Sequence, residues 1–388
     1  MGFTEMTGDS NIYRKVFCLN GREEELVLGQ YVDDSIILAS SPEAQQWLME
    51  RLSKRFPVNP NSSGNISFGE PGLILSMNVR YDIERGILQF DQSHAIEHLA
   101  KKLRLTDCAP RSLPVSPDLN LPKLKVPEVD VNQYLSVLGS VLHIAQVSRP
   151  DISFACGALA RHSAAPGVAH YEAALDLVKY LYSTKNMYIQ YQRCGDGGND
   201  PEMYERGLKT DSSSPMTIEQ RLVASVPSND TPSPTAYVDA DYAGEKETRR
   251  STSGFIVMMN SGPIAWSSRL QKLCAQSSAE SEIYAVCDAA KEAIHIRLLC
   301  EEMGMREPGV PMRIYEDNSA CVQMGHSIRG SNAAKHFEVR LRFLHERIQL
   351  KEIEFAKIAT ADQLADPFTK PMPFPAFARF RDVMLRHD

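Results

Sequence analysis

Apolar and polar positions alternate along residues 236–388 in a way that predicts strands and helices in turn. Short apolar runs bounded by turn residues predict strands at 236–238, 254–259, 264–268, 312–315 and 353–358. The sequence Asn260-Ser261-Gly262-Pro263 separates the second run from the third at hairpin spacing. We therefore expect the first three strands to form two successive antiparallel hairpins.

Helical spacing of apolar side chains predicts a long helix that begins after Ser277. Ser277 and Glu280 match the Ser-x-x-Glu capping box, in which each side chain bonds a backbone N–H group of the other residue. Thr360 and Gln363 match a second such box, which would open a short helix. Further helices are expected from about residue 319, over 335–350 and near 367. The order of these elements predicts an α/β domain with a mixed sheet.

Residues 194–235 have a composition unlike the rest of the chain, rich in Gly, Ser, Pro, Asp and Asn. A segment of this kind cannot bury enough apolar surface to offset the entropy lost on ordering. We therefore expect a flexible polar linker here. It divides the chain into an N-terminal region, residues 1–193, and a C-terminal domain, residues 236–388.

The composition narrows the class of protein. The chain has 388 residues, of which 43% are hydrophobic and 23% charged, as in ordinary globular proteins. No apolar run approaches the roughly 20 residues that span a bilayer, and the N-terminus lacks the pattern of a secretory signal. We expect no membrane partner and an intracellular location, cytoplasmic or nuclear. The net charge of −7 argues weakly against a general nucleic-acid binder but leaves room for local basic patches.

Four carboxylates fall at related places in this layout. Asp239 follows the first strand and Asp317 follows the fourth. Glu282 lies in the first turns of the long helix, and Asp366 precedes Pro367. Each alone is explained as a turn, capping or helix-end residue. Together, four acids at one end of a sheet would repel one another unless cations bind. Two Mg²⁺ ions ~4 Å apart would neutralise such a cluster and support phosphodiester hydrolysis.

Seven motifs in the C-terminal domain occur in the order of a known family. They are AYVDADYAG, RRSTSGFIV, IAWSSRLQK, SSAESEIYAV, IYEDNSA, KHFEVRLRFLHERI and DQLADPFTKPM. In this order they resemble the ribonuclease H (RNase H) domain of copia-type retrotransposon polyproteins. The resemblance implies an RNase H-like fold, in which helices flank a five-stranded mixed sheet. It also implies cleavage of the RNA strand of an RNA–DNA hybrid with two Mg²⁺ ions, or with Mn²⁺ in their place.

The resemblance implies roles for individual acids. The catalytic metal ligands would be Asp239, Glu282, Asp317 and Asp366. By analogy, Asp239 would bridge both ions and Asp366 would serve the ion that activates water. The other two acids would serve the ion at the leaving group, with Glu282 near the RNA 2′-OH. Asp239 rather than Asp241 matches the strand-ending acid of the family, and capping gives Glu280 a structural task. Asp241 and Glu280 are therefore expected to support the ligands.

Basic side chains accompany the acids in the C-terminal domain. Two lie in the loop after the first strand and four in the helix over 335–350: Arg249, Arg250, Lys335, Arg340, Arg342 and Arg347. Contact with phosphates is the functional interpretation, because basic side chains supply most of the affinity for a nucleic-acid backbone. Solvated surface charge is an equally good interpretation of any one of them.

The N-terminal region carries a second acidic motif. Two apolar runs flank the sequence Tyr-Val-Asp-Asp, which predicts a hairpin with Asp33 and Asp34 at its tip. A plain polar turn would have the same pattern. The sequence resembles the YVDD motif of reverse transcriptases, and its surroundings resemble the late palm, thumb and connection of a copia-type polymerase. The resemblance implies that Asp33 and Asp34 lie beside polymerase metals.

The expected activities of the two regions differ. In the family a further palm acid lies well upstream of YVDD, and the residues before Asp33 contain no such segment. We therefore expect a truncated reverse transcriptase, residues 1–193, that does not extend a primer alone, joined to a complete RNase H domain. The partners would be an RNA–DNA hybrid and other parts of the polyprotein. The alternative is an inactive transposon relic or a co-opted nucleic-acid-binding protein.

Overall fold

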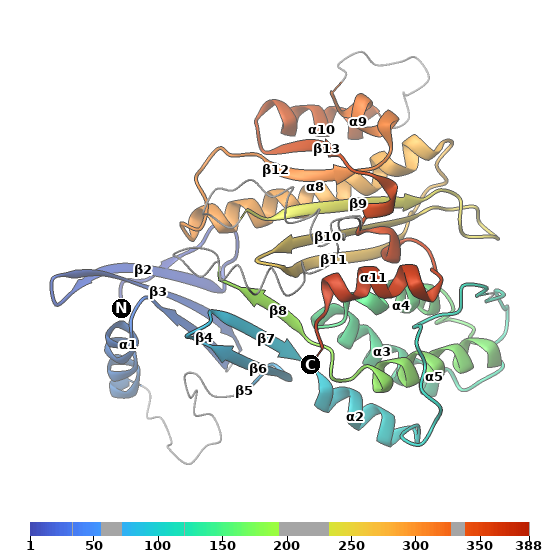
Figure 1. Ribbon diagram of the computed structural model, residues 1–388, viewed down its shortest axis with the longest axis horizontal. Coiled ribbons are helices and arrows are strands. Elements are labelled where there is room, and N and C mark those ends of the chain that lie inside the picture. Colours follow the sequence, from blue (N-terminus) through green and yellow to red (C-terminus); the bar gives the residue numbers. More distant parts are fainter. Residues whose placement is uncertain (33, 56–71, 120, 194–232, 327–337, 388) are drawn as a thin grey trace, which may run out of the picture.

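The chain folds around three β-sheets (Figure 1). The structure is a computed structural model, and it describes residues 1–32, 34–55, 72–119, 121–193, 233–326 and 338–387. Among these residues, two sheets have four strands and one has five. The expected linker, residues 194–235, lies almost wholly outside the described residues.

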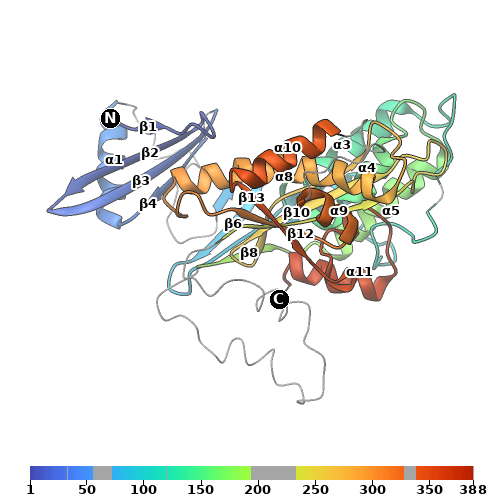
Figure 2. The same cartoon turned by 90° about the horizontal axis from the view of Figure 1, so that it is seen from above.

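The first sheet has one covered face. Its strands, in spatial order, are β1 (Thr4–Glu5), β2 (Ile12–Leu19), β3 (Arg22–Tyr31) and β4 (Asp34–Ala39), all antiparallel. Helix α1 (Pro42–Arg55) packs against one face, around Leu26 and Leu48. Because side chains alternate along a strand, Ile37 is buried in this core, whereas Ile36 and Leu38 are exposed. Figure 2 shows this sheet and α1 at one end of the molecule.

A second sheet and a group of helices form the middle of the chain. The strands are β5 (Gly72–Ile74), β6 (Met77–Asp82), β7 (Ile87–Asp91) and β8 (Ile189–Gln192). The helices are α2 (Ser93–Lys102), α3 (Val131–Val147), η1 (Pro150–Ile152), α4 (Ser153–Ala160) and α5 (Val168–Ser183), where η marks a 3₁₀ helix. Their shared apolar core contains a buried ion pair between Arg149 and Asp151, at 2.7 Å. The Tyr180 hydroxyl donates a hydrogen bond to the same carboxylate, so this buried charge is compensated.

The third sheet is the five-stranded mixed sheet that the resemblance implied. Its strands are β9 (Thr235–Asp241), β10 (Thr252–Met259), β11 (Gly262–Leu270), β12 (Met312–Glu316) and β13 (Ile353–Lys357). The spatial order is β11-β10-β9-β12-β13. Strand β10 runs antiparallel to both β9 and β11, and β12 runs parallel to both β9 and β13. The predicted α/β class and the two predicted hairpins are therefore confirmed.

Each of the five strands differs from its expected bounds by one or more residues, and two of these differences have a physical cause in the sheet. Strand β9 continues through Asp239 to Asp241, so that Asp239 lies inside the strand rather than after it. Strand β11 already includes Pro263, because Asn260 and Ser261 alone make the turn, both with positive φ. Proline lacks the N–H group that a strand ladder uses, and the pairing with β10 shifts register beside it.

Helices cover both faces of the third sheet (Figure 1). One face carries α8 (Ser278–Glu302), α9 (Ser319–His326) and α10 (Glu338–Gln349), and the other carries η3 (Thr360–Asp362), η4 (Asp366–Phe368) and α11 (Phe374–Met384). On the first face, Val238 packs with side chains of α8. On the second face, Tyr237 and Phe368 share a core with Met187 and Ile189 from the middle of the chain. The second core thus joins segments from both sides of the expected linker, and the domain boundaries stay a prediction.

The two expected capping boxes have different outcomes. Ser277 caps α8, because its hydroxyl accepts the N–H of Glu280 at 3.2 Å. The Glu280 carboxylate bonds the N–H of Gln276, at 2.7 Å, rather than that of Ser277. The second box does not form, and η3 has no side-chain cap. The Gln363 side chain instead donates to the carbonyl of Val238 at 2.8 Å, which ties this segment to β9.

Candidate active site

The alternation of side chains along parallel neighbours decides which acids can meet. In β9, Val238 faces α8, whereas Tyr237 and Asp239 face η4. Tyr237 is paired with Tyr315 of β12. Two residues further along each chain, Asp239 and Asp317 therefore lie side by side at the same end of the sheet.

Glu282 reaches the same place from the second turn of α8. One ligand oxygen from each of Asp239, Glu282 and Asp317 lies within 4.8 Å of the others. Asp239 and Glu282 are each only 5% exposed, whereas Asp317 is partly exposed. The structure thus brings together three of the four acids that the sequence singled out, with one of them open to solvent.

The fourth acid, Asp366, lies beside this group but is held differently. It begins η4, and its carboxylate pairs with Nζ of Lys370 at 2.8 Å. The same Nζ lies 3.8 Å from Oδ2 of Asp239, and the Thr369 hydroxyl donates a hydrogen bond to that oxygen. The sequence analysis missed Lys370 and Thr369, although a lysine four residues after an aspartate is a signal for an ion pair.

A glycine in β10 allows the η4 segment to approach the sheet. Gly254 is paired with Asp239 across the two strands. A Cβ atom at position 254 would lie 2.6 Å from Cβ of Phe368 and 2.7 Å from Cγ2 of Thr369. The absence of a side chain therefore makes the space in which η4 packs over Asp239.

Burial and mutual repulsion raise the pKa values of carboxyl groups in the site. For Glu282, burial raises the pKa most, and the charges of Glu316 and Asp239 raise it further. Burial, and then the charge of Asp239, raises the pKa of Asp366 to about 6, although Lys370 acts in the opposite direction. Carboxylates that bind protons this readily also gain from binding a metal cation.

Glu316 is a fifth acid of the site, which the sequence analysis missed. It is 1% exposed, and its Oε1 accepts the backbone N–H of Asn318 at 2.8 Å. Within the described part of the chain, its Oε2 has no hydrogen-bond partner, and neither has Oε2 of Glu282. Burial raises the pKa of Glu316, whereas the Asn318 amide lowers it. Alternation along β12 was the available signal, because it places Glu316 on the same face as Ile314, toward α8.

The two acids expected to support the ligands have separate positions. Asp241 ends β9, where burial raises its pKa and the charge of Lys370 lowers it. Glu280 is buried, and its Oε1 accepts a hydrogen bond from the Tyr284 hydroxyl at 2.6 Å. With its bond to the Gln276 amide, Glu280 has the structural task that the sequence indicated.

Two of the candidate basic residues lie in the loop after β9. Arg249 is exposed and Arg250 is partly buried, and backbone hydrogen bonds between each of them and Glu245 close the loop. Arg161, which follows α4, reaches the start of β10, where its Nη2 donates to Oγ1 of Thr252 at 3.2 Å. The middle of the chain therefore contributes a basic side chain beside this loop.

The remaining basic candidates belong to the region of α10. The guanidinium of Arg340 lies 4.2 Å from the ring centre of Tyr284, within the range of a cation–π contact. Arg342 pairs with a glutamate one turn earlier at 2.6 Å, and Arg347 pairs with two glutamates at 2.9 Å each. Lys335 lies outside the described residues. Contact of these side chains with phosphates stays a prediction.

The YVDD motif forms the expected hairpin between β3 and β4, with Tyr31 paired to Asp34. Val32, at the turn, has a positive φ of 51°. Asp33 and the side chain of Asp34 lie outside the described residues. Their expected place beside polymerase metals, and the expected lack of primer extension, therefore stay predictions.

Sequence comparisons agree with the motifs. The chain is 25% identical over 386 residues to the retrovirus-related Pol polyprotein from transposon TNT 1-94 of Nicotiana tabacum, covering 98% of this chain and 26% of that protein. It is 27% identical over 384 residues to the Pol polyprotein from transposon RE1 of Arabidopsis thaliana, covering 98% and 23%. No family model matches. The chain spans about a quarter of the length of these relatives.

The chain is thus a homologue, along nearly its whole length, of the retrovirus-related Pol polyproteins of copia-type transposons. Among solved structures, LC11-RNase H1, whose crystal structure is described as in complex with RNA/DNA hybrid, matches with a TM-score of 0.27 and 12% identity. That match covers 35% of this chain and 93% of the other. The strand order, rather than this neighbour, defines the fold. Every helix in the described part of the chain is too short or too polar to cross a membrane.

Proposed function

We propose that the C-terminal part of this chain is a metal-dependent endonuclease that cleaves the RNA strand of RNA–DNA hybrids. One observation carries the proposal, namely the convergence of Asp239, Glu282 and Asp317 at the end of a sheet with the order β11-β10-β9-β12-β13. Homology to retrovirus-related Pol polyproteins supports it. A hybrid is a substrate that such a polyprotein would itself create when RNA is copied into DNA.

The residues present fit divalent metal ions. Carboxylate oxygens are the ligands that Mg²⁺ and Mn²⁺ prefer. Among the described residues, Oε2 of Glu282 is buried with no hydrogen-bond partner, which leaves this oxygen able to bind a cation. In this proposal Asp239, Glu282 and Asp317 hold one ion, and Asp239 with Asp366 holds a second. When bound, the ions polarise the scissile phosphate and lower the pKa of the attacking water.

Other side chains of the site orient these ligands and the substrate. The hydrogen bond from Thr369 fixes one oxygen of Asp239. Glu282, approaching from α8, is proposed to face the RNA 2′-OH, the group by which a protein tells RNA from DNA. Arg249 and Arg250, in the loop after β9, are proposed to contact phosphates of the hybrid.

The test is cleavage of a labelled RNA–DNA hybrid by the full chain in Mg²⁺, with duplex DNA as the substrate that should stay intact. Asp317→Asn removes one charge from the most exposed ligand. We expect it to lower the cleavage rate by roughly two orders of magnitude, the scale for losing one group that stabilises charge in a transition state. Asp288→Asn is the matched control, because Asp288 lies on an exposed face of α8, 3.6 Å from Lys291, and should leave the rate unchanged.

Three outcomes would count against this function. Equal cleavage by the Asp317→Asn variant and the parent chain would place the activity elsewhere. Cleavage that survives removal of metal by EDTA would contradict the metal-dependent mechanism. A folded parent chain that binds the hybrid without cutting it would instead favour the alternative of a relic or a co-opted nucleic-acid-binding protein.

A further inference from the structure

The acids of the site fall into two groups that differ in what neutralises them. Asp239, Glu282 and Asp317 converge on one space. Asp366 instead faces the ammonium group of Lys370, which lies 2.8 Å from Asp366 and 3.8 Å from Asp239. Building on the proposed metal-dependent function, we propose that Lys370 is a built-in cation at the Asp366 half of the site, so that a second metal ion binds there only by displacing it.

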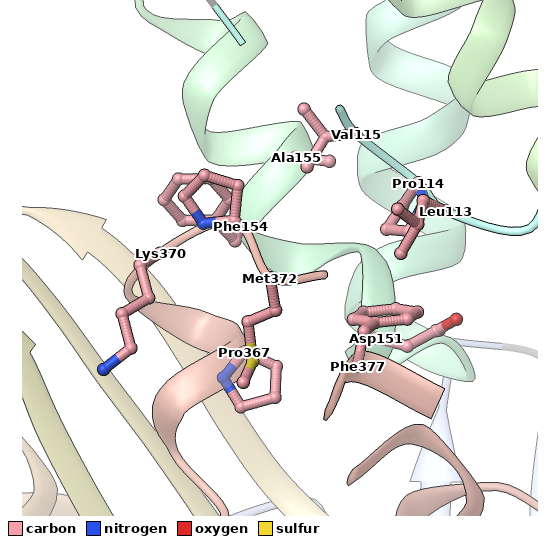
Figure 3. Close-up of a pocket in the computed structure, with 11 residues that line it drawn as sticks. Leu113, Pro114, Val115, Asp151, Phe154, Ala155, Pro367, Lys370, Met372 and Phe377 are labelled. Carbon is pink, nitrogen blue, oxygen red and sulfur yellow. The ribbon is translucent and has the colours of Figure 1, made fainter. Parts of the chain in front are cut away.

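The backbone of Lys370 is fixed by its neighbours. Phe368 and Thr369, directly before it, are completely buried. A small apolar cavity between this segment and α4 is lined by Pro367 on one side and Phe154 on the other (Figure 3). The segment is therefore packed against both the third sheet and the helices of the middle of the chain. The backbone cannot move away from the site without breaking this packing.

The side chain of Lys370, in contrast, can leave the site. In Figure 3 it extends away from the other labelled side chains, with its nitrogen at the far end. The Lys370 side chain is 39% exposed, compared with 9% for Asp366 and 7% for Asp239. Because the lysine stem is long and flexible, a change of rotamer would carry the ammonium group into water while both acids stay in place.

Charge decides which cation holds this half of the site. The ammonium group brings one positive charge to Asp366 and Asp239, whereas Mg²⁺ brings two and binds several oxygens at once. The two cations repel each other at short range, so simultaneous binding of both to the same pair of carboxylates is unfavourable. Lys370 therefore keeps Asp366 and Asp239 in position at low metal concentration and lowers the affinity for the second ion. The first ion, at Asp239, Glu282 and Asp317, is affected less, because Lys370 lies nearer to Asp366, at 2.8 Å, than to Asp239, at 3.8 Å.

The competing explanation is an ion pair that only stabilises the fold. In that case, removal of Lys370 would lower the stability of the chain and leave its metal affinities unchanged. Metal binding without substrate separates the two explanations, because it reads the affinity of each half of the site directly.

The test measures Mn²⁺ bound by the full chain, with the free ion followed by electron paramagnetic resonance. For the parent chain we expect one tight and one weak site. Lys370→Met keeps the aliphatic stem and removes the charge. It should lower the Kd of the weak site for Mn²⁺ about ten-fold and change the Kd of the tight site by no more than about two-fold.

Three variants keep the test decisive. Lys291→Met removes the same charge from the ion pair with Asp288 and should change neither site. Lys370→Arg keeps the charge and should keep the second site weak. Should Lys370→Met fail to fold, Lys370→Gln makes the same comparison.

A second site that is equally weak in the Lys370→Met chain, or two equally tight sites in the parent chain, would overturn the inference. The readout does not depend on cleavage. A chain that shows the expected Mn²⁺ behaviour yet leaves the hybrid intact would contradict the proposed nuclease activity alone.

Discussion

The sheet of strands β1–β4 and the sheet of strands β9–β13 both follow the alternation of side chains, but they differ in how many faces are covered. Helix α1 covers one face of the first sheet, and the other face exposes Val16, Ile36 and Leu38. Helices cover both faces of the other sheet, so that Val238 and Tyr237, neighbours in β9 that point in opposite directions, are both buried.

This difference explains where a cluster of carboxylates can exist. Exclusion of water from both faces raises the pKa values of Glu282 and Asp366. A bound cation would therefore stabilise their charged forms. The cover also includes the middle of the chain, where the carbonyl of Ala145 accepts a hydrogen bond from the indole of Trp266 at 2.8 Å. Residues that precede the expected linker in the sequence therefore help to cover the sheet that carries the proposed nuclease site.

The largest expected effect comes from truncating a buried side chain in the core between η4 and the β9–β13 sheet. Phe368→Ala should lower the free energy of unfolding of the β9–β13 sheet by about 3–5 kcal/mol, because Phe368 is completely buried. Leu38→Ala should change that of the β1–β4 sheet by no more than about 0.5 kcal/mol, because Leu38 is 61% exposed. Each sheet region has one tryptophan, Trp47 in α1 and Trp266 in β11, so urea unfolding of Trp47→Phe and Trp266→Phe backgrounds follows each separately. Equal losses in the free energy of unfolding for Phe368→Ala and Leu38→Ala would contradict the expected difference between the two sheets.

An intermediate effect is expected from a pair of strand glycines. Gly254→Ala should lower the free energy of unfolding by about 1–3 kcal/mol, because the new methyl group collides with Phe368 and Thr369. It should also weaken hybrid cleavage, since Thr369 holds Asp239. Gly29→Ala, in β3, meets nothing within 4 Å and should be neutral or slightly stabilising. Urea unfolding and cleavage rates of both variants check this, and a harmless Gly254→Ala would show that η4 can move freely.

The smallest expected effect concerns pH. A carboxyl group whose pKa is raised by folding binds more protons in the folded chain than in the unfolded one, so its contribution to stability is lost as the pH rises. For Asp366 the loss runs from its unfolded pKa, near 4, through about 6, at about 1.4 kcal/mol for each unit of pKa difference. Glu282 extends the loss to higher pH, because its pKa is also raised.

Thermal unfolding in EDTA, from about pH 4 to pH 8, measures this loss. The parent chain should lose more stability near pH 6 than the Asp366→Asn variant, which has no group to titrate there. Mg²⁺ should restore stability, and restore more of it at higher pH, because it takes the place of the lost protons. A parent chain and a variant with the same pH dependence would mean that Asp366 is not held in a dry site.

The sequence predicted most of the third sheet, because short apolar runs and helical spacing are local signals. Asp239, Glu282 and Asp317 could be singled out from the order of their motifs, and the structure brings them together. The capping box at Thr360 was wrong because a distant partner, the carbonyl of Val238, takes the Gln363 side chain. Spacing alone cannot reveal such a tertiary contact.

Other misses have different physical causes. Pro263 is tolerated in β11 because this strand lies at the edge of the sheet, where only one side of the backbone is paired. Glu316 was overlooked because the expected strand stopped at Tyr315, one residue before β12 ends. Lys370 follows Asp366 at an informative spacing, but its second contact, with Asp239, depends on how η4 folds back over β9.

The alternation in β9 also makes the gene sensitive to the gain or loss of a single codon. Val238 and Asp239 point to opposite faces of one strand. An in-frame insertion or deletion of one residue within β9 would exchange them, placing a carboxylate in the apolar core beside α8 and a valine beneath Thr369. Packing and the proposed metal binding would be lost together. In copies of a transposon that accumulate mutations, the unbroken length of β9 is therefore as necessary to the proposed nuclease site as each of its acids.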